Sequence, residues 1–284
     1  MHNLGLVGAN GFIGTSLKSS SIFSEYDIQS FGREDLITSD LNFQDMVPNL
    51  DSIIWAASLT NPSIAEVRPD LVDLELEHWK YFLEKLSTLK SAIPKLLFIS
   101  SGGCVYSGDK SYFEERDEAY GSNAYGRLKS RMEQALIDSG LRHSIIRAAN
   151  VYGPNQPTGR GQGVVAEWVN AAKFGSPINL YGDSQVHRDF LYITDFLESL
   201  KLVLESEVCH TVNVGSGKSE SLATVIDALH THSPIPLNIS YFPARGYDRR
   251  SYCLDISLAN NCFGWTPRIS LDSGIAKCFS SDLV

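Results

Sequence analysis

Residues 3–14 read NLGLVGANGFIG, an apolar run that leads into glycines at positions 8, 11 and 14. Where a strand turns sharply into a helix, Gly8 permits the turn, Gly11 lets the backbone approach a pyrophosphate, and Gly14 allows the helix to pack on the strand. Free amides at the start of the helix then face the phosphates. The flanking apolar segments favour this interpretation over an ordinary glycine-rich turn. The stretch therefore predicts a dinucleotide site that also includes Phe12 and Ile13.

Apolar periodicity alternates between strand and helix patterns along the rest of the chain. Strands are expected near residues 3–7, 26–31, 52–55, 95–99, 143–147 and 212–215, and helices include 71–89 and 124–138. Alternating elements imply right-handed crossovers and a parallel sheet. Ligands of such sheets bind at the carboxyl ends of the strands. The predicted fold class is α/β, a Rossmann doubly wound parallel sheet.

A second chemical signal is the pair Tyr125 and Lys129 within residues 122–129, SNAYGRLK. Four-residue spacing places both side chains on one face of a helix. A phenol loses its proton near pH 10, so a tyrosine base at neutrality needs about 4 kcal/mol of stabilisation, and a neighbouring ammonium supplies part of it. Such pairs also occur by chance on solvated helices. The glycine pattern upstream is what favours a catalytic role for this pair.

Further segments match one known group of enzymes, in order, along nearly the whole chain. They are DSIIWAA at 51–57, LFISSGGCVY at 97–106, RAANVYGP at 147–154, YGD at 181–183, HRDFLYITD at 187–195, VNVGSG at 212–217 and FGWTP at 263–267. With the glycine loop and the Tyr-x-x-x-Lys pair, they resemble the extended short-chain dehydrogenase/reductase superfamily, in its nucleotide-sugar epimerase/dehydratase branch. The resemblance implies an NAD(P)-dependent enzyme that acts on a nucleoside-diphosphate sugar.

The resemblance also implies catalytic roles. Tyr125 is expected to take the proton of a sugar hydroxyl while hydride leaves the same carbon for the nicotinamide, and Lys129 to support the phenolate and hold the nicotinamide ribose. The family's usual Ser or Thr hydroxyl falls at Gly102, which has no side chain to donate a hydrogen bond. We expect Ser101 to replace it. The alternatives are Cys104, a water, no group at all, or a serine that merely ends the strand.

Cofactor preference depends on the end of the second strand, where the family usually has an acid that binds the adenosine 2′-hydroxyl of NAD. Gly32 stands at that position, and Arg33 beside it could pair with a 2′-phosphate. The sequence therefore favours NADP over NAD, unless Arg33 is a solvated loop charge. Asp40 and Leu41 resemble the family's contact to the adenine ring, although they could equally be residues of a surface loop, and Ala56 and Ala57 resemble further cofactor contacts.

Substrate contacts are implied by the resemblance one residue at a time. Asn150 is expected to bond the sugar or a phosphate, and Asp248 to contact the nucleoside ribose. Arg188 and Arg245 are expected to clamp the diphosphate, because two guanidiniums make strong charge-assisted bonds to such a group. Tyr181 is expected to lie in the same pocket.

The chain is expected to form two regions. Residues 1–154 and 186–215 would make the dinucleotide-binding Rossmann domain, and residues 155–185 and 216–284 a smaller C-terminal α/β lid that binds substrate. The helices near 71–89 and 124–138 resemble those that form a four-helix dimer interface in the superfamily, so a homodimer is expected.

Composition limits the remaining possibilities. The formal net charge of −9 argues against nucleic-acid binding. The five cysteines have no Cys-x-x-Cys pair and the histidines no ligand spacing, so neither a metal site nor a disulfide framework is expected. A strand at residue 3 and the lack of a long apolar run predict no signal peptide and no membrane span. A cytoplasmic protein is expected.

Among the family's reactions, we rank an NDP-hexose 4-epimerase first. The alternative is an NADPH-dependent 4-keto-hexose reductase, which Gly32 and Arg33 favour. A dehydratase is less expected, because Gly103 and Cys104 stand where its Asp-Glu pair would be. A non-catalytic cofactor sensor would lack Tyr125 or Lys129, and both are present.

Overall fold

The structure is a computed structural model that describes residues 2–32, 47–89, 92–246 and 249–280. Four residues with a predicted role lie outside the described residues. They are Arg33, Asp40, Leu41 and Asp248.

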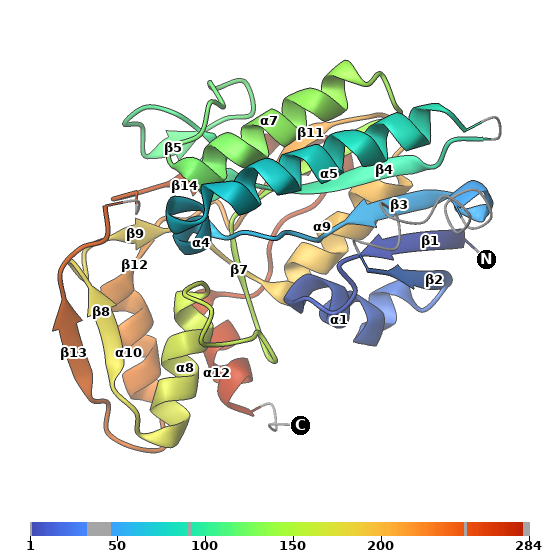
Figure 1. Ribbon diagram of the computed structural model, residues 1–284. Helices are drawn as coiled ribbons and strands as arrows, with labels where there is room; N and C mark the ends of the chain where they lie inside the picture. The colour runs from blue at the N-terminus through green and yellow to red at the C-terminus, as the bar shows by residue number, and fades with distance from the viewer. Residues whose placement is uncertain (1, 33–46, 90–91, 247–248, 281–284) are drawn as a thin grey trace.

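A parallel sheet forms the centre of the described chain (Figure 1). Its strands, in spatial order, are β2 (Tyr26–Phe31), β1 (His2–Val7), β3 (Ser52–Trp55), β4 (Lys95–Ser101), β6 (His143–Ala148) and β11 (Thr211–Val214). Strand order reverses at β1, which pairs with β2 on one side and β3 on the other. A doubly wound sheet opens its ligand crevice at such a point. The predicted Rossmann-type α/β class is confirmed, as are the six predicted strands to within two residues at each end.

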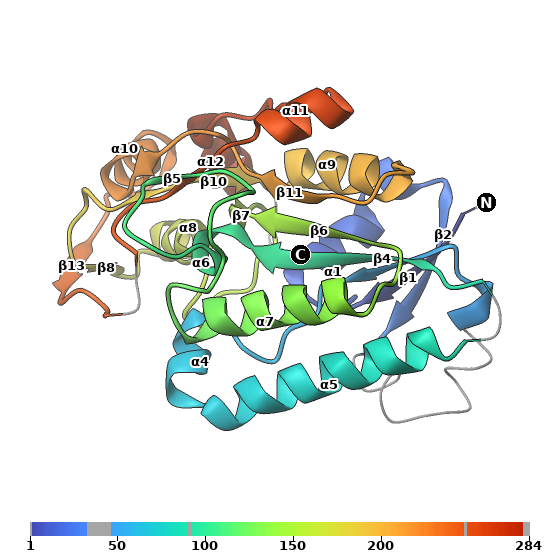
Figure 2. The same cartoon turned by 90° about the horizontal axis from the view of Figure 1, so that it is seen from above.

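Helices cover both faces of the sheet (Figures 1 and 2). The helices α5 (Pro69–Ser87) and α7 (Ala124–Asp138) pack on one face, and α1 (Phe12–Ser19) and α9 (Ile193–Glu205) on the other. Because successive strand residues point to opposite faces, Ile53 belongs to the core under α5 and α7, and Ile54 to the core on the other side. The sheet is buried on both faces, as a parallel sheet requires.

A smaller layer stands beyond the carboxyl ends of the strands (Figure 1). It contains the strand pair β8 (Ile178–Tyr181) and β13 (Ile239–Phe242) with the helices α8 (Val164–Phe174), α10 (Leu222–His232) and α12 (Leu271–Ser280). The layer occupies the place expected of the substrate-binding lid, and the division of the chain into two regions stays a prediction.

Short elements connect these layers. They are η1 (Ser21–Phe23), η2 (Val47–Asn49), α4 (Pro62–Val67), α6 (Gly102–Val105), β5 (Tyr112–Phe113), β7 (Asn150–Tyr152), β9 (His187–Arg188), β10 (Phe190–Tyr192), β12 (Glu220–Ser221), β14 (Cys253–Leu254) and α11 (Ser257–Phe263). Two of them, α6 and β7, follow the sheet strands β4 and β6 with at most one residue between, so they lie at the strand ends where a ligand is expected.

The outer surfaces of α5 and α7 carry exposed apolar side chains, among them Leu74, Tyr81 and Ile137. The expected dimer contact through these two helices stays a prediction. Within the described ranges, no helix combines the length and the apolar character that crossing a membrane requires.

Candidate active site

The glycine loop between β1 and α1 depends on backbone conformations and contacts that a side chain would prevent. Gly8 has a φ of 91°, in the left-handed region that favours glycine, and a Cβ there would lie 2.7 Å from the amide nitrogen of Ala57. A Cβ on Gly14 would lie 2.4 Å from the carbonyl oxygen of Gly8. These two glycines therefore hold α1 close against the end of β1, as the sequence predicted.

Gly11 has a different reason for being glycine. A Cβ there would meet only the carbonyl oxygen of Gly8, at an ordinary 3.4 Å. Packing within the protein thus does not require a glycine, which is consistent with a position kept small for a ligand. Gly11 precedes the first turn of α1, and no described side chain caps that turn. The first amides of a helix have no partner within the helix, so they are suited to phosphate oxygens.

Tyr125 and Lys129 lie on the first turns of α7. Asn123 begins this helix by accepting a hydrogen bond from the Gly126 amide, at 2.8 Å. Gly126 brings the helix against α6, because a Cβ there would lie 2.0 Å from the carbonyl oxygen of Cys104. The helix start is thereby held beside the end of β4, the strand that carries Ser101.

The two side chains of the pair differ in burial and in charge environment. Lys129 is only 2% exposed, and its Nζ lies 5.4 Å from the ring centroid of Tyr125. Burial raises the pKa of Tyr125 above its ordinary value, the ammonium of Lys129 opposes that rise, and the carboxylate of Glu75 adds to it. Burial disfavours the charged form of Lys129, yet the charges of Tyr125 and Glu75 still raise its pKa.

The missing hydroxyl at Gly102 has a structural explanation. A Cβ at this position would lie 2.6 Å from a methyl group of Leu254 and 3.0 Å from the carbonyl oxygen of Arg147. Packing therefore closes the place where the family serine would stand. Ser101 lines the cavity described next, and Cys104 lines its side extension.

A cavity of about 700 Å³ opens between the carboxyl ends of the strands and the smaller layer. It brings together most of the residues that the sequence predicted for the site. Those that line it are Phe12, Ile13, Ala56, Ala57, Ser101, Tyr125, Lys129, Asn150, Tyr181, Arg188 and Arg245. A side extension of about 110 Å³ reaches Cys104, Asn123, Arg249 and Tyr252.

The lining of the cavity is rich in arginine, and we call these arginines the arginine wall. Among the described lining residues, the arginines are Arg160, Arg188, Arg245, Arg249 and Arg250, and the acid is Asp183. The Arg245 guanidinium lies 4.9 Å from the ring centroid of Tyr181, and that of Arg249 lies 4.7 Å from the ring of Phe113. Arg249 also donates to the carbonyl oxygen of Gly108, at 3.0 Å. A strongly positive wall in a chain of net charge −9 is suited to an anionic ligand.

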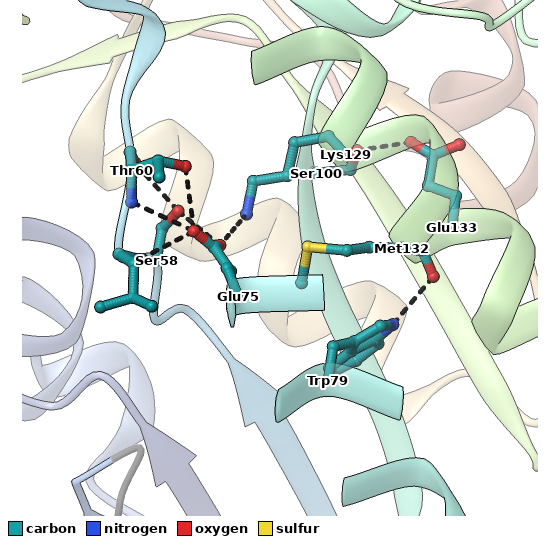
Figure 3. A network of polar contacts seen from close by, with 9 residues as sticks. Ser58, Thr60, Glu75, Trp79, Ser100, Lys129, Met132 and Glu133 are labelled. Carbon is teal, nitrogen blue, oxygen red and sulfur yellow. Dashed lines mark hydrogen bonds and ion pairs between the residues drawn. The ribbon is translucent and has the colours of Figure 1, made fainter. Parts of the chain in front are cut away.

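Sequence reasoning missed two polar residues that contact the catalytic pair. Ser58 follows β3 and hydrogen-bonds the phenol of Tyr125, and Glu75 on α5 lies against Lys129 (Figure 3). A signal for Glu75 was available. It falls on the buried stripe of α5 with Trp79, Phe82 and Leu86, where an acid is unexpected.

In the described part of the chain, no group of three or more His, Cys, Asp or Glu side chains could hold a metal ion.

A glycine loop lies at the switch point of a parallel sheet, and the helix start that follows it, Phe12 and Ile13, lines the same cavity as the Tyr-x-x-x-Lys pair. Together these features define the class of short-chain dehydrogenase/reductase folds. The family model for the NAD dependent epimerase/dehydratase family matches residues 5–215. The chain belongs to this family, which confirms the resemblance seen in the sequence.

Individual relatives have several activities. The chain is 31% identical over 192 residues to a dTDP-4-dehydro-6-deoxyglucose reductase of Escherichia coli, covering 66% of this chain and 61% of the reductase. It is 27% identical to a UDP-glucose 4-epimerase of Mycolicibacterium smegmatis over 96% of both chains. The crystal structure of a Thermus thermophilus UDP-glucose 4-epimerase in complex with NAD has the same fold, with a TM-score of 0.87, 22% identity and coverage of 98% of this chain and 97% of that one.

The residues of the glycine loop fit a dinucleotide. Gly8 and Gly14 make the close turn, Gly11 leaves room beside the uncapped start of α1, and Phe12 with Ala56 lines the cavity next to it. This arrangement suits a pyrophosphate at the helix N-terminus. When bound, a nicotinamide dinucleotide accepts or supplies hydride.

Proposed function

We propose that the protein is a 4-epimerase, which inverts the configuration at C4 of a nucleoside-diphosphate hexose by oxidising the C4 hydroxyl to a keto group and reducing it again from the opposite face. The observation that carries the proposal is that one cavity is lined by Tyr125 and Lys129, by Phe12 and Ile13 directly after the glycine loop, and by the arginine wall. The 27% identity to a 4-epimerase over 96% of both chains supports the same reaction.

The arginine wall supports the substrate class. A diphosphate carries charge that two or more guanidiniums bind with charge-assisted hydrogen bonds. Arg188 on β9 and Arg245 after β13 line the same cavity, so together they would hold the diphosphate and direct the hexose toward Tyr125. Asn150 would contact the sugar from the start of β7, and Tyr181 would pack against the nucleoside.

Proton transfer would be carried out by Tyr125, with Lys129 beside it on α7. Tyr125 would remove the proton of the C4 hydroxyl as the carbon loses hydride, and would return it when hydride arrives on the opposite face. Lys129 would stabilise the intervening phenolate and hold the ribose of the dinucleotide. Ser101 would donate a hydrogen bond to the same sugar oxygen.

A 4-keto-hexose reductase is the second candidate, and one observation favours it. The carboxylate of Glu75 lies 3.3 Å from Lys129 Nζ and offsets its charge, which favours the protonated tyrosine that reduction needs. The similarity to the E. coli reductase supports this candidate as well. The preference for NADP, based on Arg33, stays a prediction.

The state of the dinucleotide in purified protein distinguishes the two candidates. An epimerase regenerates its cofactor in each cycle, so the protein should retain about one dinucleotide per chain and turn over without added cofactor. A reductase should release its dinucleotide and require stoichiometric NADPH or NADH. Acid extraction followed by chromatography gives both the occupancy and the identity, NAD or NADP. If the purified protein contains no dinucleotide and consumes NADPH or NADH during turnover, the epimerase proposal is wrong.

Ser101 can be tested against Cys104. Ser101→Ala should lower kcat about 10-fold, the value of one hydrogen bond near 1.4 kcal/mol, and change substrate binding less. Cys104→Ala should have a smaller effect, because its thiol faces the side extension. Steady-state kinetics of both variants is the measurement. If neither variant changes kcat, a water or a backbone amide must donate the hydrogen bond to the sugar oxygen instead.

A further inference from the structure

Glu75 is a buried acid in the middle of the apolar face of α5. Its side chain is 3% exposed and lies on the same stripe as Trp79 and Phe82. Acids are rarely buried without partners that compensate the loss of water. The environment of Glu75 therefore indicates what the residue does.

Every group that contacts the Glu75 carboxylate is a hydrogen-bond donor. Oε2 accepts from the amides of Leu59 and Thr60, at 2.9 and 3.1 Å, and from the Thr60 hydroxyl, at 2.9 Å. Oε1 accepts from the hydroxyl of Ser58, at 2.7 Å. Donors alone suit an ionised carboxylate, which has only acceptors to offer. The segment after β3 thus forms a fixed cradle for one negative charge.

The fifth contact of this carboxylate joins it to the catalytic pair. Its Oε1 lies 3.3 Å from Lys129 Nζ, and both side chains are almost completely buried. Figure 3 shows Glu75 between the Ser58–Thr60 segment and Lys129. One turn away on each helix, the Trp79 indole donates to the carbonyl oxygen of Met132, at 2.9 Å. The α5 and α7 helices are therefore fastened together beside Lys129.

Ser58 links the same carboxylate to the phenol. Its hydroxyl donates to Glu75 and is hydrogen-bonded with Tyr125. Tyr125, Ser58, Glu75 and Lys129 consequently form a ring of neighbouring polar groups. Within this ring, a positive and a negative charge lie close together, so the field that would stabilise a phenolate is partly cancelled.

We propose that Glu75 is a positioning residue that fixes Lys129 and, by offsetting its charge, keeps Tyr125 in the phenol form in the free enzyme. Tyr125 then begins as a proton donor. In carbonyl reduction it gives its proton to the sugar oxygen and is left as a phenolate, while the carbon accepts hydride from a reduced dinucleotide. This inference rests on the proposed function. The same protonated state serves the second half of an epimerase cycle and the whole of a reductase reaction.

Other ionisable groups near the ring do not replace Glu75. Cys104 faces Tyr125 from α6, and burial raises its pKa, so the thiol is neutral near pH 7. Glu133 is the next acid along α7, and it is paired with Arg147. Arg188 and Arg249 reach the side extension of the cavity, which Tyr125 also lines.

The test is the ionisation of Tyr125 in cofactor-free protein. Tyrosine labelled with ¹³C at Cζ reports phenol and phenolate by NMR, and the Tyr125 resonance is the one lost in Tyr125→Phe. Glu75→Gln keeps the volume and one acceptor oxygen but removes the charge. The pH midpoint of Tyr125 should fall by about one unit or more, the effect of a nearby like charge being removed. Because no substrate is present, this result is independent of the sugar specificity and of the proposed reaction.

Glu133→Gln is the matched control, since it neutralises another buried carboxylate on the same side of the sheet. Glu133 acts on Lys129 but not directly on Tyr125, and it is paired with Arg147, so this variant should shift the Tyr125 midpoint much less. An unchanged midpoint in folded Glu75→Gln, or an equal fall in Glu133→Gln, would overturn the inference. If Glu75→Gln does not fold, Glu75→Gln/Lys129→Met removes both charges of the pair. Its midpoint should lie below that of Lys129→Met alone, and equality of the two would also overturn the inference.

Discussion

Replacing Tyr125 by phenylalanine is expected to lower turnover at least about 10²-fold, the usual contribution of a general acid or base, with substrate binding nearly intact. The substitution removes one oxygen and keeps the ring, which lies 5.4 Å from Lys129 Nζ and lines the cavity. The loss should therefore appear in kcat rather than in KM. Conversion of UDP- and dTDP-hexoses, followed with each dinucleotide, is the measurement.

Two controls separate chemistry from structure in this variant. Dinucleotide binding, measured by fluorescence titration, should be unchanged, because the glycine loop belongs to the β1–α1 connection and does not include Tyr125. Circular dichroism should show the wild-type fold. If Tyr125→Phe keeps most of the wild-type rate, another group transfers the proton, and the mechanism proposed for α7 is wrong.

Local sequence rules predicted the elements that depend on neighbouring residues. The helix predicted over 124–138 has those limits, and it begins at Ala124 because Asn123 caps its first turn. The helix predicted over 71–89 instead spans Pro69–Ser87, since Pro69 is well suited to a first helical position. Gly8 and Gly14 were recognisable because their roles depend on backbone conformation and on the turn that follows β1.

Residues that act through distant partners were not predictable in this way. Glu75 and Lys129 are far apart in sequence, and only the packing of α5 on α7 brings them to 3.3 Å. The side chain that closes the position of the missing hydroxyl at Gly102 is Leu254, from near the other end of the chain. Arg249 was overlooked because its isolated sequence context resembles a surface charge. The family resemblance was enough to predict most residues that line the cavity. The charges around Tyr125 and Lys129 depend on tertiary packing, which the sequence pattern does not reveal.

Arg147 illustrates how the same packing stabilises the fold beside the site. It lies on β6 and is buried, and its guanidinium donates to Glu133 Oε2 at 2.7 and 3.1 Å and to the carbonyl oxygen of Glu115 at 3.0 Å. Glu133 also accepts from the hydroxyl of Ser100, at 2.5 Å. The pair therefore connects β6, β4 and α7, three residues before Asn150 enters the cavity.

Arg147→Met should reduce the free energy of unfolding by about 3–5 kcal/mol, because it leaves the Glu133 carboxylate buried without its ionic partner. Urea denaturation of wild type and variant is the measurement. Arg142→Met is the matched control, since Arg142 pairs with Glu207 at the exposed surface. An exposed pair contributes at most about 1 kcal/mol. If both variants lose a similar free energy of unfolding, then burial of the ion pair does not determine how much stability its disruption costs.

The double variant Arg147→Met/Glu133→Leu separates two quantities. One is the net stability that the ion pair contributes, and the other is the stability lost when one charge is left buried without its partner. Removing both charges also removes the desolvation penalty, so much of the stability lost in Arg147→Met should return. The hydroxyl of Ser100 then loses its acceptor, and recovery should be incomplete. A double variant that is no more stable than Arg147→Met would mean that the ion pair itself, rather than the avoidance of an unpaired charge, holds β4 and β6 against α7.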